Sequence, residues 1–129
     1  MMSPNASLVR KAYEYFANGN IAGVIESFDS SITWHVPVHS PISGDYKGRD
    51  EIVGFFKRTL ELCGGVFAIE VHHLLADSDI VVALVTVKAE RNGRAAAFPE
   101  AHVWRVASGK IIEFREFQGD EQTEDGFWS

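Results

Sequence analysis

Two runs of residues decide the fold: Ile32-Thr33-Trp34-His35-Val36-Pro37 and Gly48-Arg49-Asp50-Glu51-Ile52-Val53-Gly54-Phe55-Phe56. The first predicts a short strand, and Pro37 ends its ladder hydrogen bonding. The second predicts an amphipathic helix, because Asp50 and Glu51 suit the positive end of the helix dipole. A loop over 38–48 joins them. Strand and helix can enclose one apolar space, with these side chains: Trp34, Val36, Ile52, Phe55, Phe56 and Leu60.

The chain before these runs has helical periodicity, and the chain after them alternates with a period of two. Helices are expected over about 5–18 and 20–28. Strands are expected over 66–75, 80–90, 95–106 and 110–118, followed by a polar tail over 119–129. Helices followed by an antiparallel meander predict one α+β domain over residues 1–129, with three N-terminal helices on a strongly curved sheet. Such a sheet forms a cone-shaped barrel around a pocket.

Composition excludes several classes of function. The formal charge is −6, and Lys and Arg form no run, so neither nucleic acid nor an anionic membrane is an expected partner. Cys63 is the single cysteine, which excludes a disulfide framework. The chain has neither a secretory signal nor a membrane-spanning run, so the cytoplasm is the expected location. No glycine-rich phosphate loop and no metal-ligand spacing is present, and neither a cofactor nor a metal is expected.

The candidate chemistry lies on the last two predicted strands. Because side chains alternate along a strand, His102 shares a face with Trp104, and Glu116 shares a face with Phe114. A three-residue connection at Gly109 pairs the two strands so that His102 lies opposite either Phe114 or Glu116. In the first register Glu116 is a diagonal neighbour of His102, and in both the histidine and the glutamate come together in apolar surroundings. Burial raises a carboxyl pKa and a nearby imidazolium lowers it again, which suits acid–base catalysis near neutral pH. The alternative is a buried pair that only stabilises the barrel.

Other residues have weaker claims to the pocket. Asp120 either closes the pocket mouth as a second acid or is a solvated charge in the tail. Tyr13 either donates its hydroxyl into the pocket or packs in the core. His39 could line the mouth, whereas His35 alternates away from Trp34 and should face outward. The residues expected to contact a ligand are Tyr13, Phe16, Trp34, Val36, Phe55, Phe56, Trp104 and Phe114.

The order and spacing of several short motifs resemble a known superfamily. The motifs are Asn18-Gly19-Asn20, Thr33–Pro37, Gly48–Ile52, Asn92-Gly93-Arg94, and His102–Val106 before Gly109-Lys110. From about residue 6 to 120 the chain resembles the nuclear-transport-factor-two-like superfamily, and within it the SnoaL-like polyketide cyclases and ketosteroid isomerase-related proteins. The resemblance implies a cone-shaped α+β barrel with a deep apolar pocket, usually dimeric. It implies no single reaction.

The resemblance also separates two chemistries. The ketosteroid isomerase base aligns with Val36, its oxyanion-hole aspartate with His102, and its helical tyrosine with Ala12, one residue before Tyr13. These departures argue against steroid isomerisation by that mechanism. The inward histidine and acid of the polyketide cyclases align with His102 and Glu116, although a glutamate replaces their aspartate.

Three hypotheses follow for the function. In the first, the protein is a cofactor-free enzyme of cyclase or isomerase type that moves a proton on a small hydrophobic carbonyl compound, cyclic or polyketide-like. Glu116 is then the acid/base, and His102 is its partner or an oxyanion donor. In the second, the same pocket binds a small molecule without turnover. In the third, the protein is a structural dimer with a vestigial pocket. A homodimer is expected, because Leu84, Val103 and Ile111 make the outer face of the meander apolar.

Overall fold

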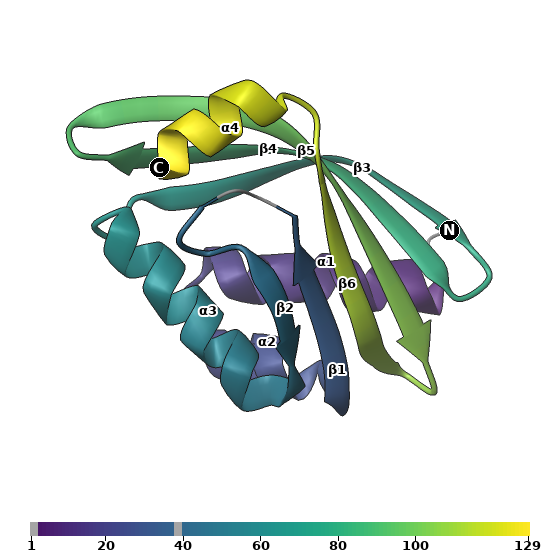
Figure 1. Ribbon diagram of the computed structural model, residues 1–129. Helices are drawn as coiled ribbons and strands as arrows, with labels where there is room; N and C mark the ends of the chain where they lie inside the picture. Colours follow the sequence, from purple (N-terminus) through teal and green to yellow (C-terminus); the bar gives the residue numbers. More distant parts are fainter. Residues whose placement is uncertain (1–2, 38–39) are drawn as a thin grey trace.

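The computed structural model describes residues 3–37 and 40–129, and it shows helices packed on one curled sheet (Figure 1). The helices are α1 (Pro4–Ala17), α2 (Ile21–Glu26), α3 (Gly48–Leu62) and α4 (Glu121–Trp128). The strands are β1 (Phe28–Val36), β2 (Gly44–Lys47), β3 (Phe67–Asp77), β4 (Ile80–Arg91), β5 (Arg94–Ala107) and β6 (Lys110–Gln118). The predicted α+β class is confirmed. In the described ranges, no helix is long and apolar enough to cross a membrane.

The first two helices begin at polar caps. The Ser3 side chain accepts a hydrogen bond from the Ala6 amide, and Pro4 occupies the first turn, where its missing N–H costs nothing. The Asn20 side chain caps α2 by accepting from the Gly23 amide. Between the two helices Gly19 has φ 72°, a left-handed conformation that favours glycine. The two helices pack against each other and against the sheet.

The sheet is mixed, in the order β2-β1-β6-β5-β4-β3. The predicted meander is present as β3 to β6, but β1 adds to it by pairing parallel with β6. Part of the loop expected over 38–48 is strand: β2 pairs antiparallel with β1, and the Tyr46 hydroxyl donates to the Ile42 carbonyl at 2.7 Å. The sheet curls around α1, with α3 along β1 and β2 (Figure 1). The concave face therefore surrounds the apolar core.

A bulge between β5 and β6 corrects two expectations. Arg105 pairs with Glu113, but Val106 pairs with Ile111, so Ile112 is an extra residue in β6. The extra residue reverses the alternation, and Ile111 is fully buried instead of lying on the outer face. The connection is a two-residue turn rather than three, with positive φ at Ser108 and Gly109.

The tail expected over 119–129 is also corrected. Residues Glu121–Trp128 form α4, and both Phe127 and Trp128 are buried. Their rings contact Phe98 and Phe67, at 5.7 and 6.4 Å between centroids. The Arg91 guanidinium donates to the Phe127 and Trp128 carbonyls at the end of α4. Two late aromatic residues thus anchor a helix that covers one end of the sheet (Figure 1).

Candidate functional site

A cavity of about 70 Å³ lies between the concave face of the sheet and the helices α1, α3 and α4. Its lining includes every predicted ligand-contacting residue except one: Tyr13, Phe16, Trp34, Phe55, Phe56, Trp104 and Phe114. Val36 is buried but does not line this cavity. The lining also includes three acids and a histidine, namely Glu100, Glu116, Glu124 and His102. Acid–base groups and aromatic walls thus share one enclosed space.

Aromatic rings pack directly against one another around this space. Trp34 stacks on Phe114 with 3.8 Å between ring centroids, because β1 and β6 place these residues opposite each other. Trp104 meets Phe114 edge-on at 4.7 Å across the β5–β6 ladder. Buried rings in offset or edge-to-face contact stabilise a fold beyond the area that they remove from water. The walls are therefore rigid, and they keep the dielectric around the polar groups low.

A chain of hydrogen bonds runs from Trp104 to Glu100. The Trp104 Nε1–H donates to the Tyr13 hydroxyl oxygen at 3.0 Å, and that oxygen lies 2.6 Å from Nδ1 of His102. On the other side of the imidazole ring, Nε2 lies 2.7 Å from Oε1 of Glu100. The chain joins α1 to β5, and His102 is its middle member. Both Glu100 and His102 are buried.

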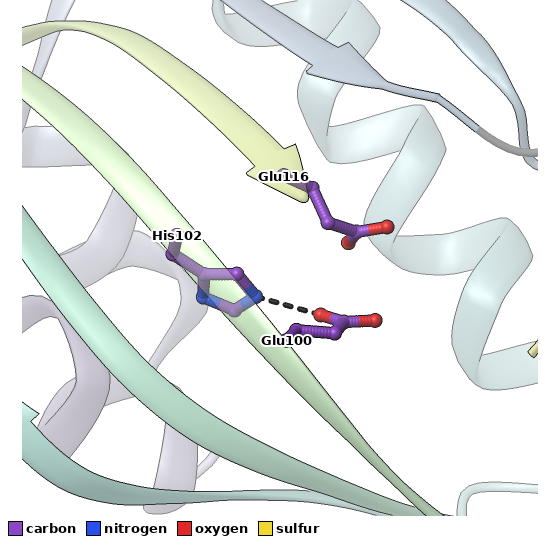
Figure 2. A group of neighbouring side chains, drawn as sticks. All are labelled: Glu100, His102 and Glu116. Atoms are coloured by element: carbon purple, nitrogen blue, oxygen red, sulfur yellow. Dashed lines mark hydrogen bonds and ion pairs between the residues drawn. The ribbon is translucent and has the colours of Figure 1, made fainter. Parts of the chain in front are cut away.

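Two more carboxyl groups surround this chain. Glu116 pairs with His102 across the β5–β6 ladder, and its side chain extends from the neighbouring strand toward the side where Glu100 lies (Figure 2). Glu124 reaches the cavity from α4, and only 1% of its surface is exposed. Its Oε1 atom, like Trp34 Nε1, makes no hydrogen bond within the described ranges. Three acids therefore meet in one apolar cavity that no Lys or Arg of the described residues lines.

Burial shifts the pKa of each group toward its neutral form. Burial lowers the pKa of His102 to about 3, so the imidazole is neutral over the physiological range. Burial, followed by the charge of Glu124, raises the pKa of Glu116 to about 8. Burial, with the charge of Glu116 next in size, raises the pKa of Glu100 well above its usual value, and burial raises that of Glu124. The cavity therefore holds protonated acids near neutral pH.

The structure changes the partner expected for His102. Glu116 is its cross-strand neighbour, as one of the two predicted registers had it, but the hydrogen bonds go to Glu100 and Tyr13. The sequence contained the signal for Glu100, because residues two apart in a strand share a face. Glu124 had no such signal, since its segment was expected to be a tail.

The remaining candidates lie elsewhere. Asp120 does not line the cavity. It is exposed, and its side chain caps α4 by accepting from the Thr123 amide at 3.2 Å. The acid that this region contributes to the cavity is Glu124, four residues later. His35 does not line the cavity either, and its Nδ1 lies 2.7 Å from Asp45. His39 lies outside the described residues.

Spacing alone would admit a metal ion among the carboxylates and the imidazole. Ligand atoms of Glu100, His102 and Glu116 all lie within 4.8 Å of one another. Both nitrogens of His102, however, are already engaged in short hydrogen bonds, to Tyr13 and Glu100. This arrangement satisfies both nitrogens of the imidazole without a metal.

A family model for the SnoaL-like domain matches residues 9–114. The chain belongs to the SnoaL-like family. The uncharacterized protein Rv0034 of Mycobacterium tuberculosis is 28% identical over 123 residues, which cover 95% of this chain and 94% of that protein. The superfamily expected from the sequence motifs is thereby confirmed.

Solved structures agree with this assignment. Bal32a, from a soil-derived mobile gene cassette, is similar with a TM-score of 0.93 and 34% identity, over 98% of this chain and 97% of that one. TerC, which was co-crystallized with polyporic acid, has a TM-score of 0.88 at 20% identity, over 97% and 98% of the two chains. The second likeness shows the shared fold alone. The cavity of this SnoaL-like protein must therefore be understood from its own residues.

The buried acids predict how the stability of the protein depends on pH. A carboxyl group whose pKa is higher in the folded chain than in the unfolded chain stabilises the fold at low pH, and this contribution is lost as pH rises through the folded pKa. The neutral imidazole of His102 has the opposite effect. Its contribution to the free energy of unfolding is lost as the pH falls below the ordinary histidine pKa of 6.5. Above pH 6.5 the acids of the cavity therefore determine how the stability changes with pH. The free energy of unfolding should fall by on the order of a few kcal/mol between about pH 6.5 and 8.

Urea denaturation of the parent and of Glu116→Gln measures this effect. The variant removes one acid of the cavity while keeping the shape of its side chain, so the stability of the variant should fall less steeply with pH. The exposed Glu61→Gln should leave the slope of the parent unchanged. Equal slopes in the parent and in Glu116→Gln would show that Glu116 does not hold its proton in the folded protein.

Proposed function

We propose that this protein is a cofactor-free enzyme that moves a proton on a small hydrophobic carbonyl compound, as a cyclase or isomerase does. The observation that carries the proposal is the position of Glu116. Its carboxyl group lies in an aromatic cavity, beside a second buried acid and a neutral histidine. A pKa raised to about 8 makes its carboxylate a far stronger base than an ordinary glutamate.

Glu116 and His102 have different roles in this reaction. Glu116 removes a proton from the carbon next to the carbonyl group and returns it to the same or another carbon. His102 stays neutral, because burial holds its pKa at about 3, and it therefore acts by hydrogen bonding rather than as an imidazolium. The carboxylate of Asp120 caps α4 outside the cavity, so we assign it no role in this reaction.

The cavity also limits the ligand. A volume of about 70 Å³ lined by aromatic rings favours a small, flat and unsaturated compound. The co-crystal of TerC with polyporic acid supports the idea that this fold accommodates a small organic molecule. We therefore propose compact cyclic ketones, or polyketide-like compounds of similar size, as the substrate class.

The second candidate is a binding module with the same pocket and no turnover. The observation in its favour is that the Tyr13–His102–Glu100 chain is bonded within the protein. A buried network of this kind stabilises a fold whether or not it does chemistry. The two candidates differ in one property, which is the exchange of carbon-bound hydrogen in a bound ketone.

Substitution of the base tests the enzymatic proposal. A panel of small cyclic ketones is incubated with the protein in D2O, and deuterium at the carbons next to the carbonyl is followed by NMR. The parent should accelerate exchange, and Glu116→Gln should reduce the rate by about 10²–10⁴-fold. Binding of the same ketone should stay within a few-fold, because the amide keeps the shape of the side chain.

Asp120→Asn is the matched control for this experiment. Asparagine caps a helix as well as aspartate does, so α4 should persist and exchange should proceed at the parent rate. Ketone binding by the parent without any accelerated exchange would refute the enzymatic proposal and leave the binding module.

We further propose that the protein is a homodimer through the outer face of β4, β5 and β6. Leu84 is 40% exposed and Phe117 is 49% exposed on this side of the sheet, although Ile111 belongs to the core. Both pair with Ala101 of β5, which lies between their strands. Large exposed apolar side chains in one row of a sheet face are typical of an interface between copies of one chain.

Light scattering at micromolar concentration should give about twice the chain mass of 14.3 kDa. The double variant Leu84→Glu/Phe117→Glu should give the single-chain mass, because charges placed on both strands repel across a symmetric interface. A parent sample containing only a species near 14.3 kDa would end the dimer proposal.

A cytoplasmic location is also part of the proposal. Cys63 is a buried free thiol, which suits a reducing compartment. The net charge of −6 remains an argument against a nucleic-acid or anionic membrane partner.

A further inference from the structure

We propose that Glu100 is a positioning residue that sets the direction of the hydrogen bonds through His102, and thereby determines whether the Tyr13 hydroxyl donates to His102 or to a carbonyl oxygen in the cavity. The inference rests on the proposed function and deepens it. It gives a role to a residue that touches no reacting atom, and it names the group that would hold the oxygen of the substrate.

The hydrogen bonds around His102 are limited by the number of hydrogens available. An indole nitrogen can only donate, so the Tyr13 oxygen must accept from Trp104. The neutral imidazole of His102 carries one hydrogen for two nitrogens, and both nitrogens lie within 2.7 Å of a partner. Two arrangements satisfy these contacts with the hydrogen bonds running in opposite directions, and only a protonated Glu100 permits the second.

In the first arrangement Glu100 is ionised and can only accept. Nε2 of His102 then carries the hydrogen and donates to Glu100, while Nδ1 accepts from the Tyr13 hydroxyl. The hydrogen of Tyr13 is fully used within the protein. A ligand in the cavity finds no donor there.

In the second arrangement Glu100 is protonated and donates to Nε2. The hydrogen of His102 is then on Nδ1, and it donates to the Tyr13 oxygen, which also accepts from Trp104. The hydrogen of Tyr13 has no place left in the chain and turns toward the cavity that Tyr13 lines. Two hydrogen bonds into the phenolic oxygen also make its O–H a stronger donor.

The surroundings of Glu100 favour the second arrangement near neutral pH. The groups that face it are His102 on its own strand, Glu116 on β6 and Glu124 on α4, with Tyr13 of α1 beyond the imidazole. None of these is a cation at neutral pH, so an ionised Glu100 would be a buried charge with no counter-charge, and it would repel Glu116 once that group ionises. Rising pH should shift the chain toward the first arrangement.

The second arrangement completes the proposed proton transfer. The Glu116 carboxylate takes a proton from the carbon next to the carbonyl group, and the C–H electron pair forms the enolate. The negative charge goes to the carbonyl oxygen, where the Tyr13 O–H donates a hydrogen bond to it. Return of the proton from Glu116 to carbon restores both residues. The ligand must therefore present a carbonyl oxygen to Tyr13 and an adjacent C–H to Glu116.

The tautomer of His102 reports this arrangement directly and needs no substrate. Long-range ¹H–¹⁵N NMR spectra of the parent distinguish a hydrogen on Nδ1 from one on Nε2 and from an imidazolium. At pH 6 the hydrogen should lie on Nδ1, and the Nε2 form should grow as the pH rises toward 9.5. A hydrogen on Nε2 at pH 6, or an imidazolium there, would overturn the proposal.

Glu100→Gln distinguishes positioning from a structural role. The amide cannot ionise, so the His102 tautomer in this variant should not change between pH 6 and 9.5, while the tautomer in Glu61→Gln should change as in the parent. A pH-dependent tautomer that persists in Glu100→Gln would assign the effect to another acid and refute the proposal. If the parent shows the Nδ1 form but does not accelerate deuterium exchange in any ketone, the proposed enzymatic function is contradicted and the role of Glu100 stands.

Discussion

The hydrogen-bonded imidazole of His102 is the constraint on which the site depends. It is buried on β5, and its two nitrogens fix the Tyr13 hydroxyl of α1 on one side and the Glu100 carboxyl group on the other. A buried polar group without partners would cost several kcal/mol, so this chain holds the first helix in one position over the sheet. Because both nitrogens of the imidazole are engaged, the Glu116 carboxyl group lines the cavity without a hydrogen bond to His102.

Two irregular features allow the apolar walls to close around the hydrogen-bonded side chains of Tyr13, His102 and Glu100. The bulge at Ile112 turns Ile111 inward and increases the local twist of β6. The helix α4 then covers the end of the sheet, anchored by buried Phe127 and Trp128, and brings Glu124 to the other acids. Without these features the acids would meet water, and their pKa values would return toward the ordinary range. The electrostatics of the site thus follow from how completely the sheet is covered.

The sequence was sufficient for the parts that depend on local pattern. Alternation placed His102, Trp104, Phe114 and Glu116 on the inner face, and helical spacing placed Tyr13 near it. Applied two residues further back, the same rule would have found Glu100. The bulge and α4 could not be predicted in this way. One inserted residue reverses the faces without any change in composition. The burial of Phe127 and Trp128 at the end of α4 depends on Phe98, Phe67 and Arg91, which are distant in the sequence.

The central claim is that the apolar cavity raises the pKa of its acids, so that Glu116 exchanges between carboxyl group and carboxylate near pH 8 while Glu100 keeps its proton. The most direct measurement is a ¹³C NMR titration of the glutamate side-chain carboxyl carbons between pH 3 and 10. The Glu116 resonance should move with a midpoint near pH 8, and Glu100 should titrate well above the exposed glutamates. If Glu100 and Glu116 instead titrate together with the exposed glutamates, near the ordinary value of 4.5, the cavity is not the acid–base site described here.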